Sequence, residues 1–198
     1  MSRSRIHAFV TLSFGLILTV LLLPALSLAQ TTGIVTFGKL KNLEFVNQFY
    51  DGGKGSLGSG PGPNFGLTFT STAQAIVSAS KGGSGNFINN PGKFPVMFFQ
   101  KGNNVTITVA NGVDTGVYFY YSALQTGQFT VYSGANGTGN ILASVSLPAN
   151  NTGCTTYKMC VWTRVVVPLS ATANSIVFSG VANNLAISKT YLGTLPKR

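Results

Sequence analysis

Residues 103–111 read NNVTITVAN, and in this stretch apolar residues alternate with polar or small ones. Val105, Ile107 and Val109 would share one face of an extended chain, because successive side chains of a strand point to opposite faces. This period of two predicts a half-buried β-strand. The next segment, GVYFYYSA at 116–123, is apolar at nearly every position. That pattern is typical of a central strand that is covered on both faces.

Further segments with strand-like patterns lie on both sides of this pair. They include GLTFTS at 66–71, GQFTVYSG at 127–134, NILASVSLP at 140–148 and NSIVFSG at 174–180. Turn signals rich in glycine and asparagine separate them, among them KGNN and SGANGTGN. No segment has a convincing amphipathic helical period. We therefore predict an all-β fold, a single-domain antiparallel β-sandwich or jelly roll of about ten strands.

The N-terminus has the features of a signal peptide. Arg3 and Arg5 form a basic region, VTLSFGLILTVLLLPAL is an apolar run, and SLAQ supplies small residues before a predicted cut after Ala29. We expect residues 1–29 to be the signal peptide and 30–198 to be the β-sandwich domain, secreted or otherwise extracytoplasmic, with no membrane span after cleavage. The apolar run is also close to the length that crosses a bilayer, so an uncleaved membrane anchor is the alternative.

The predicted mature chain is poor in charged residues. Removing the two arginines of the signal leaves eleven basic and three acidic residues, a formal net charge of +8, and the only histidine, His7, leaves with the signal. Without histidine there is no Ser-His-Asp triad and no histidine-dependent zinc site. The carboxylates are Glu44, Asp51 and Asp114, which we expect at a solvated strand position and in two turns. The protein is therefore predicted not to be an enzyme, and a secreted hydrolase is the remote alternative.

The two cysteines, Cys154 and Cys160, lie close together in CTTYKMC. In an exported chain, an even number of nearby cysteines favours a local disulfide. A metal pair would need further ligands, and a redox pair usually has two intervening residues instead of five. We predict a structural disulfide, no metal site and no cofactor.

The stretch DGGKGSLGSGPGPNFG at 51–66 has seven glycines and two prolines in sixteen residues. A phosphate-binding loop would end in Gly-Lys-Ser/Thr and open a helix, whereas this stretch leads into the predicted strand GLTFTS. A flexible linker is disfavoured inside a one-domain chain. We expect an ordered surface loop, either purely structural or in contact with a ligand. Four residues at its two ends, Tyr50, Asp51, Asn64 and Phe65, are the candidate ligand-binding residues.

Three tyrosines, Tyr118, Tyr120 and Tyr121, lie in the predicted central strand, and Trp162 follows the cysteine pair. Aromatic faces combined with amide and hydroxyl groups are suited to flat glycan sites. For aromatic residues of a central strand, however, packing in the core is the commoner role. We therefore expect the three tyrosines to pack in the core.

Several segments come in an order that resembles a known family. They are FVNQFYDGGKGSLGSGPGPNFGLTFTSTAQAI at 45–76, GSGNFINNPGKFPVMFF at 83–99, YSGANGTGNILASVSLP at 132–148, the cysteine pair, and IVFSGVANNLAIS at 176–188. Over about residues 45–193, the chain resembles a family of exported, largely uncharacterised bacterial proteins of the PEP-CTERM-associated type. The resemblance implies a cell-surface or extracellular-polysaccharide context and no established catalytic activity.

Two departures from the family pattern affect what the resemblance implies. Members typically continue into a Pro-Glu-Pro motif, an apolar helix and a basic end, whereas this chain stops at YLGTLPKR, so we expect no sorting tail. The last strand of the family commonly carries Phe-Asp-Asn where this chain has Ile187, Ser188 and Lys189. The comparison with the family therefore argues against a calcium site built on an acid at that position.

These observations predict a non-catalytic protein of the cell surface or extracellular matrix. Its expected role is low-affinity binding of acidic or neutral polysaccharide, or matrix structure. The alternative is a module for protein–protein interaction or self-assembly. The lysines are dispersed, and no basic run or nucleic-acid module appears, so nucleic acid is not expected as a partner.

Overall fold

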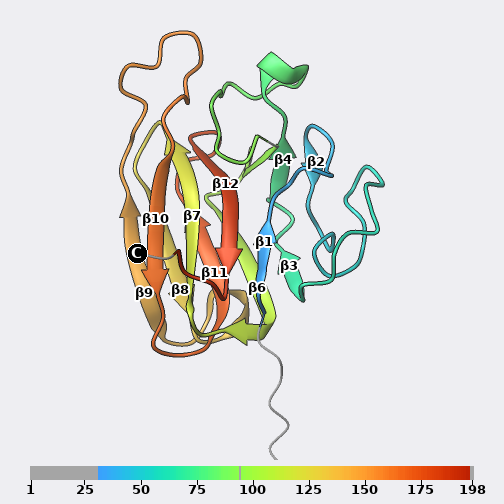
Figure 1. The fold of residues 1–198 in the computed structure, drawn as a ribbon, viewed down its shortest axis with the longest axis vertical. Helices are drawn as coiled ribbons and strands as arrows, with labels where there is room; N and C mark the ends of the chain where they lie inside the picture. The colour runs from blue at the N-terminus through green and yellow to red at the C-terminus, as the bar shows by residue number, and fades with distance from the viewer. Residues whose placement is uncertain (1–30, 94, 197–198) are drawn as a thin grey trace, which may run out of the picture.

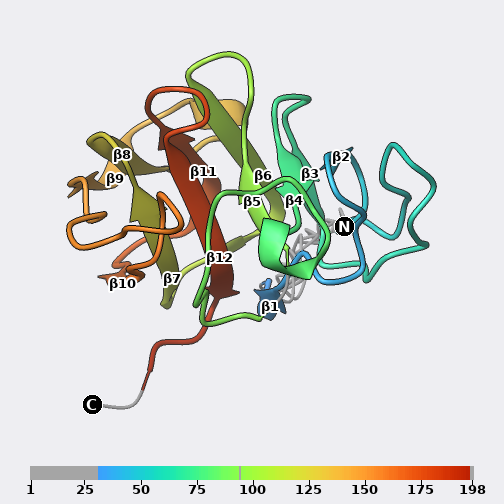
Figure 2. The same ribbon diagram turned by 90° about the horizontal axis from the view of Figure 1, so that it is seen from above.

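The computed structural model describes residues 31–93 and 95–196, so the predicted signal peptide at 1–29 lies outside the described residues. The described residues form twelve strands in two antiparallel sheets, with two 3-10 turns, η1 (Ala79–Lys81) and η2 (Ala135–Gly137). Figures 1 and 2 show the two sheets packed as layers. The predicted antiparallel β-sandwich is therefore confirmed. Within the described range, no helix is long and apolar enough to cross a membrane.

One sheet has seven strands and the other has five. The seven-stranded sheet has the order β10 (Thr163–Pro168), β7 (Gly116–Ala123), β12 (Leu185–Leu192), β5 (Val96–Phe98), β4 (Gln74–Ile76) and β2 (Glu44–Phe45), and β1 (Gly33–Val35) also pairs with β12. The five-stranded sheet has the order β3 (Leu67–Phe69), β6 (Asn104–Val113), β11 (Ala173–Ser179), β8 (Gly127–Tyr132) and β9 (Ile141–Leu147). The long strands β6 and β7 are consecutive in sequence and belong to different sheets, so the turn between them joins the two layers.

The core between the sheets contains the apolar residues whose alternation predicted the strands. The three apolar β-branched side chains of the stretch 103–111 are all buried in it. At its centre, Phe119 packs against Phe129 and Phe178, with ring centroids 4.7 and 5.0 Å away. All three rings are fully enclosed. Burying a side chain of this size stabilises a fold by about 2 kcal/mol, so this trio is a major source of stability.

The central strand β7 is covered unequally on its two faces. Its inner side chains include Phe119 and Tyr121, which are buried in the core, whereas Tyr118 and Tyr120 point to the outer face and are half-buried. The predicted core packing is therefore right for Tyr121 and wrong for the other two tyrosines. The physical reason is that the outer cover of the sheet encloses Ser122 completely but leaves Tyr118 and Tyr120 partly open.

A second, smaller apolar cluster lies on the outer face of the seven-stranded sheet. Val96 of β5 and Ala186 of β12 form it together with Phe87 and Met159, which come from two covering segments. Trp162 packs against Phe87 with ring centroids 6.0 Å apart. This cluster attaches both covering segments to the sheet.

Candidate functional site

The glycine-rich loop is organised by one buried carboxylate. Glu44 of β2 has no exposed surface, and its oxygens accept hydrogen bonds from the backbone N–H groups of Lys41 (2.7 Å), Leu57 (2.9 Å) and Ser59 (3.0 Å) and from the Ser59 hydroxyl (2.6 Å). The expectation of a solvated strand position for Glu44 is wrong, because these donors replace water around the carboxylate. Burial alone would raise the pKa of Glu44, but the hydrogen bonds outweigh it and leave the pKa below its ordinary value.

The rest of the loop is held by its own backbone. The N–H of Gly62 donates to the carbonyl of Gly53 (2.9 Å), and that of Gly55 donates to the carbonyl of Ser59 (2.9 Å). Ser56 connects the loop to β2, since its Oγ accepts a hydrogen bond from the N–H of Phe45 at 2.9 Å. The loop is therefore an ordered surface feature, as the sequence predicts.

Tyr50, the first candidate ligand residue, is buried. Only 3% of its surface is exposed, and its ring packs against those of Phe37, Phe49, Phe65 and Phe69. Burial raises the pKa of its hydroxyl, and a hydrogen bond with the Thr36 backbone offsets this only in part. As a candidate ligand-binding residue of a surface loop, Tyr50 would be expected at the surface. The structure contradicts that position, because the ring of Tyr50 is the centre of this aromatic cluster.

The other three candidate residues lie where the loop ends. Asp51 and Asn64 are exposed and form an isolated β-bridge, and the Asn64 Oδ1 accepts a hydrogen bond from the N–H of Gly66 at 3.1 Å. Phe65 is half-buried and stacks on Tyr50 with centroids 6.2 Å apart. These contacts explain the residues structurally, and their role toward a ligand remains a prediction.

A hollow of about 340 Å³ opens between this loop and β1. Tyr50 and Phe65 line it together with Lys39, Pro61 and Ile34. Asp51 and Asn64 do not line it, so the structure brings two of the four candidate residues to one hollow. Ile34 connects this hollow to the outer face of the seven-stranded sheet, where it lies opposite Tyr191 of β12.

A stacked pair of tyrosine rings lies on that outer face. The rings of Tyr118 (β7) and Tyr191 (β12) are stacked with centroids 4.0 Å apart and an interplanar angle of 10°. Val166 lies opposite Tyr118 on one side, and Ile34 lies opposite Tyr191 on the other. We call these four residues and Tyr120 the tyrosine platform. Ile34 and Val166 are 48% and 40% exposed, so the platform presents apolar surface to solvent.

The environment of the platform makes the hydroxyl of Tyr118 harder to ionise. Burial raises the pKa of Tyr118 to about 12, and the neighbouring phenols of Tyr191 and Tyr120 add to the rise, whereas Arg164 opposes it. Arg164 of β10 lies opposite Tyr120 in the strand register and is exposed. The platform therefore offers aromatic rings, phenol hydroxyls and one adjacent guanidinium.

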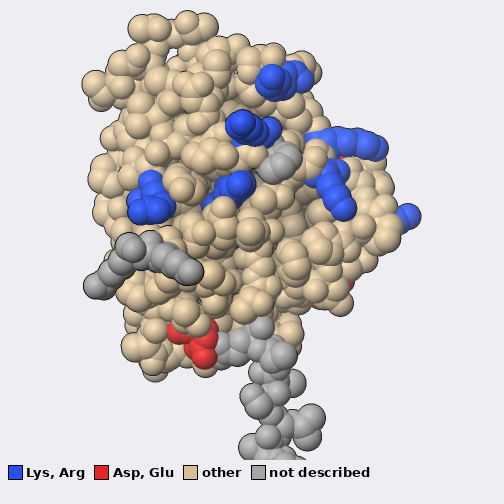
Figure 3. All heavy atoms as spheres, viewed as in Figure 1, with Lys and Arg blue, Asp and Glu red and all other residues tan. Residues whose placement is uncertain are grey.

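Positive charge gathers on the same side of the molecule. Figure 3 views the face over β10, β7 and β12 and shows several lysine and arginine side chains spread across it, with acidic side chains mainly near the lower margin. By contrast, none of the five strands of the other sheet contains a charged residue. The two outer faces of the sandwich therefore differ in charge, and the platform is on the cationic side.

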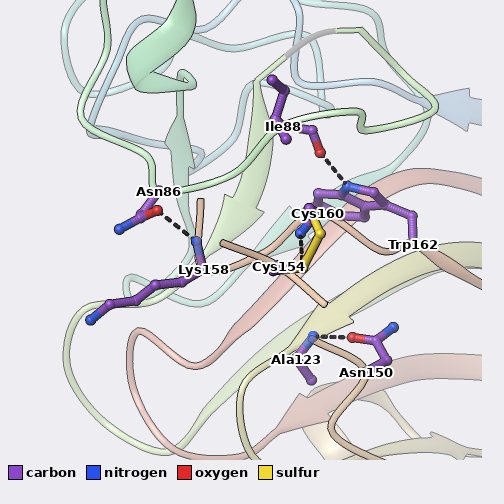
Figure 4. The surroundings of a disulfide bond; sticks show 8 residues. All are labelled: Asn86, Ile88, Ala123, Asn150, Cys154, Lys158, Cys160 and Trp162. Carbon is purple, nitrogen blue, oxygen red and sulfur yellow. Dashed lines mark hydrogen bonds between the residues drawn. A yellow bond between two sulfur atoms is a disulfide. The ribbon is translucent and has the colours of Figure 1, made fainter. Parts of the chain in front are cut away.

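The predicted disulfide between Cys154 and Cys160 is confirmed, with Cα atoms 5.5 Å apart. Figure 4 shows how the surrounding segment is fixed: the N–H of Lys158 donates to Asn86 Oδ1 (2.7 Å), and Trp162 Nε1 donates to the carbonyl of Ile88 (2.9 Å). The disulfide loop and the segment around Asn86 therefore form one cover over the sheet. A second hollow, of about 390 Å³, lies between this cover and the sheet.

The geometry offers little for metal binding or acid–base chemistry. In the part of the chain that the structure describes, no three histidine, cysteine, aspartate or glutamate side chains gather as a metal site. The carboxylate of Glu44 is surrounded by its four donors and is engaged in holding the loop.

No family model matches the chain, and no curated protein sequence matches it. Solved structures with a similar arrangement include the cleaved adhesin domain of Lys-gingipain, with a TM-score of 0.45 and 12% identity, covering 66% of this chain and 89% of that one. A family 6 carbohydrate-binding module gives 0.40 and 16% identity, covering 65% and 87%. A family 29 carbohydrate-binding module from Piromyces equi gives 0.40 and 10% identity, covering 66% and 83%. These likenesses concern the arrangement of strands, and nothing about a ligand of this chain follows from them.

Proposed function

We propose that this protein is a non-catalytic binder of acidic polysaccharide and that the tyrosine platform is its binding surface. The observation that carries the proposal is the stacked pair Tyr118–Tyr191 on an open sheet face beside Arg164. An aromatic face packs against the C–H face of a sugar ring, and a neutral phenol donates and accepts hydrogen bonds with its hydroxyls. A guanidinium pairs with a carboxylate in bidentate geometry. The three groups together match an extended chain of sugars that carry acidic units.

The proposed binding is weak and sensitive to salt. The platform lies on an open sheet face, so a ligand on it keeps much of its surface in water, unlike a ligand in a deep pocket. The predicted mature chain has a formal net charge of +8. Most of its attraction for an anionic polymer acts through solvent, where salt screens it. A predicted signal peptide and a disulfide support a site of action outside the cytosol.

The test is affinity electrophoresis of the purified protein in gels that contain a uronic-acid polysaccharide. Replacing both Tyr118 and Tyr191 with alanine should weaken retardation by about tenfold or more, because the central aromatic contact is removed. Arg164→Gln should weaken it less and reduce its dependence on salt. The matched control is Tyr132→Ala, since Tyr132 is half-buried on the uncharged sheet. Equal losses in the control and the double variant, with both still folded by circular dichroism, would contradict the proposal.

A second candidate function, self-assembly, is favoured by the edge strand β9. This strand reads ILASVSL, contains no charge and forms one edge of the five-stranded sheet. Long uncharged edges are the ones that pair with further chains. The other edges are less suited: β1, β2 and β3 have only three, two and three residues, and β10 carries Arg164 and Pro168. Pairing of two copies along β9 would also join their two five-stranded sheets, whose strands carry no charge.

Antiparallel pairing of β9 with a second β9 makes a specific prediction. A two-fold axis at Ser144 aligns all seven residues and places Ser144 of each copy opposite the other, about 5 Å apart at Cα. That separation suits a disulfide, so Ser144→Cys should yield covalent dimers under mild oxidation, whereas Thr163→Cys on the β10 edge should not. Non-reducing electrophoresis measures both. Dimers that form no faster with Ser144→Cys than with Thr163→Cys would exclude this mode of assembly.

A further inference from the structure

The hollow under the disulfide loop has an apolar floor and an amide rim. Ile76, Phe98 and Ala186 come from β4, β5 and β12 and line it from the sheet side. Gln100, Asn183 and Asn184 line it from two turns. We call this feature, of about 390 Å³, the amide hollow. Its chemistry differs from that of the platform, because it is concave and the only charged residue among its lining is Lys158.

Two of the three rim residues have their backbone fixed by hydrogen bonds, and the side-chain amides of all three are free to bind. The N–H of Asn183 donates to the carbonyl of Phe99 (2.9 Å), and the carbonyl of Asn184 accepts from the N–H of Leu124 (2.8 Å). Within the described residues, the side-chain amides of Gln100, Asn183 and Asn184 have no hydrogen-bond partner. Each primary amide offers a carbonyl acceptor and two N–H donors, so the rim carries unused capacity of both kinds.

The opposite wall is made rigid by the disulfide loop. The N–H of Met159 donates to the carbonyl of Asn86 (3.2 Å), and the N–H of Ile88 donates to the carbonyl of Met159 (3.0 Å). The side-chain oxygen of Asn86 also accepts a hydrogen bond from the N–H of Lys158, as Figure 4 shows. Both residues line the hollow. The Cys154–Cys160 bond closes this loop, so the wall is preformed and does not have to be ordered by a ligand.

We propose that the amide hollow binds a neutral sugar residue that carries a small apolar substituent, such as the methyl of an acetamido group. The methyl would pack on the floor around Phe98 and Ala186, and the rim amides would bond the acetamido carbonyl and the ring hydroxyls. A carboxylate is disfavoured there, because burying it against an apolar floor is costly and Lys158 is the only cation in the lining. This site is separate from the tyrosine platform, and it stands whether or not the platform binds acidic chains.

The test uses chitotriose as the acetamido-bearing probe and cellotriose as its matched control without the acetamido groups. Binding is followed by isothermal titration and by NMR shift changes. Chitotriose should bind in preference to cellotriose, and 0.5 M salt should change its affinity little. Gln100→Ala combined with Asn184→Ala should weaken it about tenfold. Ala186→Val, which fills part of the floor, should weaken chitotriose binding by a similar factor. The thermal midpoint of each variant shows whether it is folded.

Further variants and measurements distinguish this proposal from the proposal for the tyrosine platform. The Tyr118→Ala/Tyr191→Ala variant should bind chitotriose as the wild type does, and Ala186→Val should bind the uronic-acid polymer normally. Reducing the Cys154–Cys160 bond should weaken chitotriose binding selectively. Equal binding of chitotriose and cellotriose, or full binding by Ala186→Val, would overturn the amide hollow as the site. That result would not count against binding of the acidic polysaccharide by the tyrosine platform, which is measured separately as retardation in the gel.

Discussion

Replacing Glu44 with glutamine is expected to lower the free energy of unfolding by about 3 kcal/mol, because a buried hydrogen-bonded charge is lost. The carboxylate accepts from Lys41, Leu57 and Ser59, and the glutamine side chain would turn an NH₂ group toward donors that need an acceptor. Urea denaturation at pH 7 measures the change. The control is Asp51→Asn, the same chemical change at an exposed carboxylate of the same loop, for which we expect about 0.5 kcal/mol or less. Equal losses in the two variants would contradict the anchoring role.

The same carboxylate should make the protein sensitive to acid. The pKa of Glu44 is lowered in the fold relative to its ordinary value of 4.5, so the folded state binds this proton less readily than the unfolded chain. Its contribution to stability is therefore complete above pH 4.5 and is lost as the pH falls through the folded pKa. Urea midpoints between pH 7 and pH 3 should fall more steeply for the wild type than for Glu44→Gln. Parallel curves would show that other groups cause the acid sensitivity.

The strands could be predicted from the sequence because their signal is local. Val105, Ile107 and Val109 alternate with other residues, and the structure buries all three on one face. GVYFYYSA is different, since both of its faces are apolar and only the neighbouring elements decide which face is open. The outer cover reaches Ser122 and leaves Tyr118 half-buried, and no pattern within the strand contains that information.

The candidate site could be predicted only where its parts are close in sequence. Cys154 and Cys160 are six residues apart, and their bond was predictable from that spacing. Glu44 binds Leu57 and Ser59, thirteen and fifteen residues away in a loop without periodicity, so its role was missed. Tyr191 meets Tyr118 only through the pairing of β12 with β7. Strict alternation through LAISKTYL at 185–192 would put Tyr191 on the inner face with Leu185 and Ile187. The irregularity in strand register between Ile187 and Thr190 turns Tyr191 outward, and the segment itself contains no signal for it.

Replacing Gly62 with alanine should destabilise the protein by about 3 kcal/mol, near the upper end for overpacking at a buried site. A methyl group at Gly62 would overlap the backbone carbonyl oxygen and the ring of Phe49, neither of which can shift without disturbing the aromatic cluster around Tyr50. Gly58 is the matched control: its φ is +84° and a methyl there would meet nothing within 4 Å, so Gly58→Ala should cost only about 1 kcal/mol of backbone strain. Urea denaturation of both variants separates the two causes. If Gly58→Ala were the more costly change, left-handed backbone rather than close packing would explain the glycines. If Gly62→Ala is the more costly one, close packing on the aromatic cluster is what gives the loop its shape, and the hollow beside Phe65 depends on that packing.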